Sequence, residues 1–318
     1  MPTLTDSLKS VIQVPAGGTM TPDNLQALLT SGTDEVFKRA FDTAAFPFQG
    51  DLFYESKDIK KSALTTQTTV GLGNIPRNRD DQDVPIEPQS LGFAHSLSTL
   101  MYRGAARWTQ EFIEDEEYGQ LSDNSEELAN ASRRTVELIM ADGINRGTGT
   151  APFLCEDGGY LFDAGRPNPH PLGGTWSNID AAGAISPSMI FTSQLAFATQ
   201  NNVRGQRESQ TLTDVYVRPA DEVEIWEILK STLRPTDSMN AASFQAGRFN
   251  YHVYNLMTTA QIVFRAMGKR NELHQLWRIR PAVEDLDNTP NNVFGVMVRF
   301  RFGVGCLRPD MWRQATVS

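Results

Sequence analysis

The residue types that most often carry out chemistry are scattered along this sequence. No HExxH or CxxC pattern occurs, so no zinc site is predicted. GxxxxGK[ST] and GxSxG are also absent, and Gly71-Leu-Gly73 lacks the rest of a dinucleotide-binding fingerprint. The sequence therefore predicts no catalytic residues, no cofactor and no metal. This prediction rests on the wide separation in sequence of the histidines and cysteines, which are His95, His170, His252, His274, Cys155 and Cys306.

Two isolated features leave alternatives open. His170 lies in the Pro-rich stretch PNPHPLGG, where it is a candidate residue of an α/β enzyme. No carboxylate or cysteine stands near it, and a loop histidine without such a partner is more often structural. Asp80, Asp81 and Asp83 resemble a loose cation site, but the glycine and terminal glutamate of a calcium loop are missing. A solvated acidic turn is the simpler interpretation.

A basic group lies in residues 51–95, which are rich in threonine, then in Gly, Pro, Asp and Arg. We interpret this segment as an extended two-stranded ribbon with a polar bend around residues 74–83. It has too few large apolar residues to bury itself, so it is either a mobile surface loop or is held by another chain. The candidate subunit-interface residues are its basic side chains, which could meet an acidic patch on a partner: Lys57, Lys60, Lys61, Arg77 and Arg79.

The element expected to organise the chain is one long helix over residues 122–146. Apolar residues recur along it at helical spacing. Asp123 is expected to cap its first turn, with Glu126 at capping-box spacing, and Gly147 to end it in a left-handed conformation. About 24 residues at 1.5 Å each give a rod of roughly 36 Å, about twice the average helix, which predicts that it spans the molecule.

The flanking segments predict a mixed α and β protein. Residues 1–50 are expected to form an arm with two short helices, from Pro22 to about Leu29 and from about Thr33 to Pro47. Helix and strand signals alternate between residues 186 and 256, which is typical of a compact α/β region. In the helix after Pro219, Val223, Trp226 and Leu229 are expected to share one face. Residues 97–109 and 293–305 alternate as strands do.

Composition limits the functional class. The chain has 318 residues and a net charge of −9, which argues against a surface built to grip nucleic acid. It contains no apolar run near the ~20 residues that a membrane span needs, and its first residues show no secretion signal. Two widely separated cysteines favour buried thiols in a reducing compartment over a disulfide.

The order of these parts resembles the major capsid proteins of tailed bacteriophages, the Hong Kong 97 type of fold. Residues 102–121, YRGAARWTQEFIEDEEYGQL, resemble the strand and turn before that family's spine helix, and residues 125–147 resemble the spine helix. Residues 160–178 are similar to a loop common in the family. Residues 214–229, DVYVRPADEVEIWEIL, resemble the strand and helix of its axial domain, and residues 272–312 its closing strands.

The resemblance implies an α+β fold with a long spine helix, an extended β-hairpin loop, and peripheral and axial domains. It implies an arm in residues 1–50, an extended loop in 51–95, a peripheral domain from 96–147 with 271–318, and an axial domain from 148–270. It further implies a structural protein, not an enzyme. Such subunits form pentamers and hexamers and then an icosahedral shell around double-stranded DNA, without sequence-specific binding.

The same resemblance implies portal and scaffolding proteins and a possible decoration protein as partners, no membrane, and assembly in the host cytoplasm into a virion capsid. Some family members begin with a long charged scaffolding segment; none is visible here, so a separate protein is expected to supply that role. The related encapsulin nanocompartment shell is the alternative, and its contents distinguish the two: an enzyme cargo rather than DNA.

Overall fold

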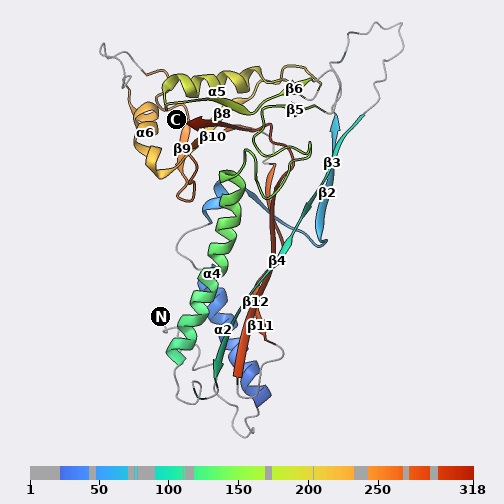
Figure 1. Ribbon diagram of the computed structural model, residues 1–318, viewed down its shortest axis with the longest axis vertical. Helices are drawn as coiled ribbons and strands as arrows, with labels where there is room; N and C mark the ends of the chain where they lie inside the picture. The colour runs from blue at the N-terminus through green and yellow to red at the C-terminus, as the bar shows by residue number, and fades with distance from the viewer. Residues whose placement is uncertain are drawn as a thin grey trace.

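The computed structural model describes residues 22–42, 48–70, 75, 77, 90–109, 111, 118–168, 174–202, 204–232, 243–267, 272–286 and 293–318. The molecule is elongated and has two parts (Figure 1). The stem is the long, narrow part, formed by a four-stranded sheet with α2 and α4. The upper lobe is broader and holds a five-stranded sheet with α5 and α6.

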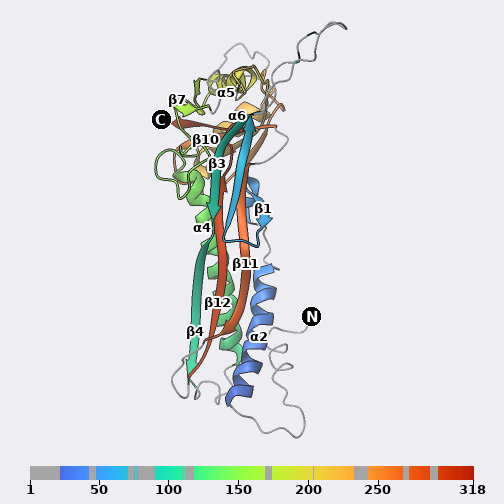
Figure 2. The ribbon, with the colours of Figure 1, turned by 90° about the vertical axis from the view of Figure 1, so that its right-hand side faces the viewer.

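The sheet of the stem has the strand order β1-β11-β12-β4. β1 is parallel to β11, and the other pairs are antiparallel. Figure 2 shows the strands running along the stem with α4 behind them and α2 beside β11, which leaves the face toward the viewer uncovered by helices. The strand bounds are Glu55–Asp58 (β1), Leu100–Thr109 (β4), Leu273–Asp285 (β11) and Val293–Cys306 (β12).

Alternation along β12 explains which face is covered. Its even-numbered apolar residues from Phe294 to Val304 are buried, whereas Met297, Arg299 and Arg301 point to the uncovered face. Successive side chains of a strand point to opposite faces, so the apolar positions of β12 face the helices while the positions between them face away. This is the division that the sequence pattern predicts.

α4, Tyr118–Asn145, is the predicted long helix, and it extends along the stem. Ala129, Val136, Met140 and Ile144 of this helix are fully buried. It begins before the predicted start, so Asp123 lies exposed inside the helix and does not cap it. Gly147 does not adopt a left-handed conformation either. A Cβ there would lie 2.7 Å from Phe162, so the glycine permits close packing instead.

The prediction of two short N-terminal helices is wrong. α2, Pro22–Asp42, is a single helix that runs through Ser31-Gly32. A glycine inside a helix costs about 1 kcal/mol relative to alanine, and packing against α4 and β11 offsets that cost. Phe37 is fully buried and stacks on Phe41 with ring centroids 5.9 Å apart. Pro47, the predicted end, lies outside the described residues.

The segment that follows ties the stem to the upper lobe. η1, Gln49–Leu52, is a short 3-10 helix whose first backbone N–H donates to Glu137 of α4 at 2.7 Å. Phe53 then lies in an aromatic cluster, with its ring centroid 4.4 Å from that of Tyr216 and 5.7 Å from that of Trp312. Residues 51–58 therefore do not belong to the predicted extended loop, because burial of Phe53 and pairing of β1 with β11 hold them in the body of the molecule.

The five-stranded sheet of the upper lobe has the order β7-β13-β10-β8-β9. α5, Pro187–Thr199, begins at the predicted Ser186-Pro187, where the Ser186 hydroxyl accepts from the N–H of Met189. α6, Glu222–Lys230, follows the 3-10 turn η3, Pro219–Asp221. The strand bounds are Ile179–Gly183 (β7), Thr211–Val217 (β8), Asn250–Val253 (β9), Gln261–Met267 (β10) and Trp312–Val317 (β13).

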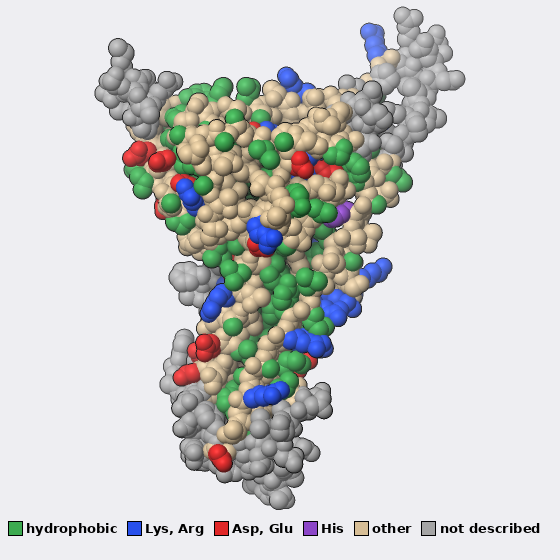
Figure 3. All heavy atoms as spheres, in the orientation of Figure 1, with side chains coloured by type: hydrophobic (Ala, Val, Ile, Leu, Met, Phe, Trp, Pro, Cys, Tyr) green, Lys and Arg blue, Asp and Glu red, His purple; other side chains and the backbone are tan. Residues whose placement is uncertain are grey.

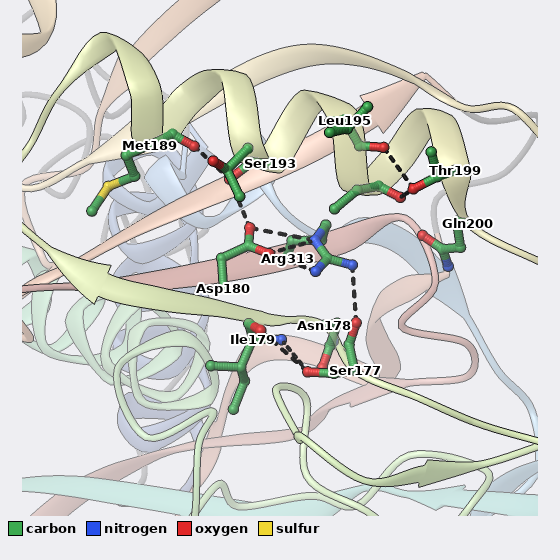
Figure 4. A network of polar contacts seen from close by, with 12 residues as sticks. Ser177, Asn178, Ile179, Asp180, Met189, Ser193, Leu195, Thr199, Gln200 and Arg313 are labelled. Carbon is green, nitrogen blue, oxygen red and sulfur yellow. Dashed lines mark hydrogen bonds and ion pairs between the residues drawn. The ribbon is translucent and has the colours of Figure 1, made fainter.

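β13 follows the stem strand β12 in the chain but lies between β10 and β7 in the upper sheet. A buried ion pair holds it there: the guanidinium of Arg313 is 2.5 Å from Asp180 of β7 and donates to the carbonyl of Ser177 (Figure 4). Ser193 of α5 donates to the same carboxylate at 2.6 Å, so one network joins β13, β7 and α5.

A buried arginine organises the loops between stem and upper lobe. Arg166 is fully buried at the start of a short pair of strands, β5 (Arg166–Pro167) and β6 (Thr175–Trp176). It forms an ion pair with Asp157 at 2.6 Å and donates to the carbonyls of Tyr160 and Leu161. Both cysteines are free and buried, as expected for core thiols.

Candidate subunit interface

The predicted ribbon is present as an antiparallel pair, β2 (Ala63–Val70) and β3 (Ser90–Ser98). At its base Leu97 and Leu64 pack against Leu276 and Leu307, and Val70 at the other end of β2 is also buried. Most other described side chains of the ribbon are exposed or half-buried, and Leu91 is 66% exposed. The bend, around residues 74–83, lies largely outside the described residues. The described strands thus project from the body along one side of the molecule (Figure 1).

The candidate interface lysines lie near the base of this ribbon, and the arginines lie elsewhere. Lys60 and Lys61 are exposed in the turn between β1 and β2, and Lys57 is exposed on β1. Arg77 is exposed, whereas Arg79 lies outside the described residues. The structure therefore brings the three lysines close in the fold, and their role at an interface stays a prediction.

The upper lobe exposes apolar side chains that the sequence prediction grouped on one face with Leu229. On α6, Val223 is 66% and Trp226 is 52% exposed, whereas Ile225, Ile228 and Leu229 are buried. The predicted shared face of Val223, Trp226 and Leu229 is therefore wrong. The aliphatic residues at 225, 228 and 229 have the i, i+3, i+4 spacing of one helical face, and this spacing in the sequence indicates the buried face of α6.

α5 presents a second exposed apolar group. Phe191 and Leu195 are about half exposed on its outer side, and Phe191 makes an edge-to-face contact with Phe244, with ring centroids 6.3 Å apart. Phe244 is itself covered on one side by the guanidinium of Arg248 at 4.3 Å. An exposed apolar patch of this kind marks a binding surface on a soluble protein.

A partly buried carboxylate lies where the ribbon meets the body. Burial raises the pKa of Glu156 to about 7, although Arg308, 3.7 Å away, opposes that rise. A hydrogen bond with Thr68 of the ribbon also lowers the pKa of Glu156, whereas the charges of Asp310 and Asp157 raise it. Glu156 therefore exchanges a proton near neutral pH at the ribbon's attachment point.

This pKa predicts a pH-dependent stability. The folded protein binds the proton of Glu156 more tightly than the unfolded chain, so its stabilising contribution is complete below about pH 4.5 and falls as pH rises to about 7. Replacing Glu156→Gln is expected to stabilise the subunit by on the order of 1–2 kcal/mol at pH 8 and to change little at pH 4.5. Urea unfolding at both pH values measures this, with the exposed Glu127→Gln as control. An equal gain at both pH values would contradict the assignment.

The described residues show no catalytic grouping. They contain no set of three or more His, Cys, Asp or Glu side chains arranged to hold a metal ion. His252 stacks on Tyr216 and lies 3.2 Å from Asp214, which accounts for it as a structural contact. His170 and the aspartates at 80, 81 and 83 fall outside the described part of the chain. Among the described helices, none combines the length and apolar character that crossing a bilayer requires.

Comparison with known proteins identifies the fold. No protein-family model and no curated protein sequence matches the chain. Among solved structures, a chain of Mycobacterium phage Patience matches with a TM-score of 0.54 at 10% identity, covering 96% of this chain and 94% of that one. The capsid of a native GTA particle matches with a TM-score of 0.56 at 11% identity over 86% and 91%. The capsid of cyanophage P-SCSP1u matches with a TM-score of 0.54 at 10% identity over 84% and 86%.

These likenesses extend over 84–96% of the chain. The chain has the fold of tailed-phage major capsid proteins, the Hong Kong 97 type, in an α+β architecture. The fold predicted from the sequence is confirmed.

Proposed function

We propose that this protein is a major capsid protein whose copies self-assemble through pentamers and hexamers into an icosahedral shell that encloses double-stranded phage DNA. The observation that carries the proposal is the likeness of nearly the whole chain to subunits of solved capsids, at 10–11% identity. The role is structural and not enzymatic. We assign the stem to the peripheral domain and the upper lobe to the axial domain.

The geometry explains how such a subunit assembles. The molecule is narrower in Figure 2 than in Figure 1, which views it down its shortest axis. In a thin shell, neighbouring copies therefore meet at the long margins that Figure 1 shows. The ribbon β2–β3 projects at one margin and lies on the next subunit in this proposal, with Lys57, Lys60, Lys61 and Arg77 beside that contact. Head-to-tail contacts of this kind close into rings when the rotation closes.

The proposed partners follow from the same function. Scaffolding and portal proteins start and shape the shell, and a decoration protein is a further candidate. Packaged DNA is held by enclosure and not by sequence-specific contacts, which suits a chain with a net charge of −9. The proposed location is the virion capsid, assembled in the host cytoplasm.

Sedimentation velocity and negative-stain microscopy of the purified full chain test this proposal. We expect closed shells, and nuclease-resistant DNA inside particles isolated from infected cells. Shells that contain an enzyme and no DNA would favour the nanocompartment alternative. A chain that remains a monomer in the presence of its scaffolding protein would overturn the proposal.

Trp226 offers a local test of the upper lobe. Exposed tryptophans at the centre of an interface carry a large share of the binding energy, typically 2 kcal/mol or more. Trp226→Ala is therefore expected to reduce assembly at a given concentration by at least about tenfold, while the free subunit keeps its melting temperature, since the side chain is half exposed. The exposed Met267→Ala, on β10, serves as the control. Unchanged assembly of the Trp226 variant would exclude α6 from the interface.

A further inference from the structure

The uncovered face of the stem sheet concentrates positive charge. Arg103 and Arg107 on β4 and Arg299 and Arg301 on β12 all point to the face opposite α2 and α4, because each lies one residue out of phase with the buried positions. Arg103 is directly opposite Arg299 in the register of the two strands. Like charges placed directly opposite one another destabilise a sheet, so this arrangement opposes folding.

Few described groups compensate this charge. Arg299 forms an ion pair with Glu284 at 2.5 Å, and the Arg103 side chain contacts the sulfur of Met101. The Nε atoms of Arg299 and Arg301 are buried without a hydrogen-bond partner in the described part of the chain. Within those residues, Arg103, Arg107 and Arg301 have no ion pair. We call these four residues the arginine face: Arg103, Arg107, Arg299 and Arg301.

The other side of the stem carries the opposite charge. Asp123, Glu126 and Glu127 lie on the outer side of α4, and none has an ion pair among the described residues. Asp123 and Glu127 are one helical turn apart, where like charges repel. Figure 3 shows acidic side chains along the lower half of one stem margin and a row of basic side chains along the opposite margin. We call these three residues the acidic ridge.

The two surfaces lie at the same level of the stem. A Cβ on Gly104, next to Arg103, would lie 3.5 Å from the side chain of Leu128, next to Glu127. Gly104 points toward α4, so Arg103 and Glu127 face outward on opposite sides at matching positions. A rotation about the axis of a ring changes neither a residue's distance from that axis nor its position along the axis. Two surfaces that meet between neighbouring copies must therefore match in both, as positions at the same level of the stem do.

We propose that the arginine face of one copy binds the acidic ridge of the next copy around a ring. This inference rests on the proposed function and specifies which surfaces meet. Arginine guanidinium groups match carboxylates with paired, charge-assisted hydrogen bonds. Met101, Met297 and Ala105 lie between the arginines and supply apolar contact. A face built to hold nucleic acid is disfavoured by the net charge of −9.

Charge reversal in two complementary variants tests the proposal. Arg103→Glu with Arg107→Glu reverses the arginine face, and Asp123→Lys with Glu127→Lys reverses the acidic ridge. Each variant alone is expected to fold, because the four side chains are exposed, and to lose more than about nine tenths of its assembled fraction. Circular dichroism checks the fold, and sedimentation velocity measures the assembled fraction. The control, Lys38→Glu with Arg39→Glu on α2, makes the same net charge change as the Arg103 and Arg107 variant and is expected to assemble.

Mixing the two reversed variants gives a sharper result. Each unlike contact pairs opposite charges, whereas each like contact pairs equal charges, so the two variants must alternate around a ring. Alternation closes only in rings with an even number of subunits, so native mass spectrometry is expected to show hexamers with three copies of each variant and no pentamers. Every wild-type copy can bind every other in the same way, so wild-type rings are not restricted to an even number of subunits.

Three outcomes would overturn the inference while leaving the shell function intact. These are normal assembly of either reversed variant, failure of the mixed variants to assemble although both fold, and equal loss of assembly in the α2 control. Normal assembly of the Arg103 and Arg107 variant with weaker binding of a short DNA duplex would assign the face to nucleic acid instead. Failure of the wild-type chain to assemble would contradict the proposed function itself.

Discussion

A chain in which Ser62 is joined to Thr99 through two glycines is expected to fold as a soluble subunit and to form no shells. The ends of the ribbon already meet, because the N–H of Thr99 donates to the carbonyl of Ser62 at 3.3 Å and Ala63 pairs with Ser98. Excision therefore requires no rearrangement of the body. The lost burial of Leu64 and Leu97 costs about 2–4 kcal/mol, whereas the lost contact with the neighbouring subunit removes assembly.

A second variant separates stability from assembly. Replacing Leu64→Ala and Leu97→Ala removes the apolar anchor on the subunit's own body but keeps the ribbon. It is expected to lower the melting temperature by a similar amount to the excision and still to form shells at a permissive temperature. Thermal melts and sedimentation velocity on both variants make the comparison. Shells formed by the excised chain would show that the ribbon has no role between subunits.

Removing the guanidinium of Arg166 is expected to have the largest effect on the stability of the isolated subunit. Arg166→Ala leaves Asp157, whose side chain is 5% exposed, without its ion-pair partner at 2.6 Å and removes one hydrogen-bond donor from each of the carbonyls of Tyr160 and Leu161. Breaking a buried ion pair by removing one partner costs about 3–5 kcal/mol. Urea unfolding of the unassembled subunit measures this change in the free energy of unfolding.

The matched control is Arg146→Ala, which removes an arginine whose side chain is 52% exposed and which pairs with Asp142 one helical turn away. An exposed pair of this kind contributes about 0.3–0.5 kcal/mol. The double change Arg166→Met with Asp157→Leu removes both charges and is expected to recover much of the lost stability. A cost for Arg166→Ala as small as that of the control would show that the buried pair does not hold these loops.

Periodicity predicted the elements whose burial is decided within one segment. α4 and β12 each present a continuous buried face, so their spacing alone identifies them. The pattern was less informative where distant contacts decide. A glycine is needed at position 147 because a Cβ there would collide with the ring of Phe162. Gly32 is tolerated in α2 because that helix packs on α4. No local signal predicts that β13 leaves the stem and inserts between β10 and β7.

The candidate interface was partly predictable for the same reason. A ribbon with few large apolar residues is visible in the sequence, and so is its group of lysines. The arginine face was not, because it requires the register of β4 on β12, which brings Arg103 opposite Arg299 from almost two hundred positions away in the chain. The exposed Trp226 was placed on the wrong face because a tryptophan at helical spacing is usually a core residue.

A reconstruction of the assembled protein by electron cryo-microscopy shows directly what the ribbon contacts. We expect closed shells in which β2 and β3 of each copy lie against the next subunit and the acidic ridge of α4 meets the arginine face across the same boundary. Particles in which each ribbon contacts only its own subunit, with these margins open to solvent, would contradict it.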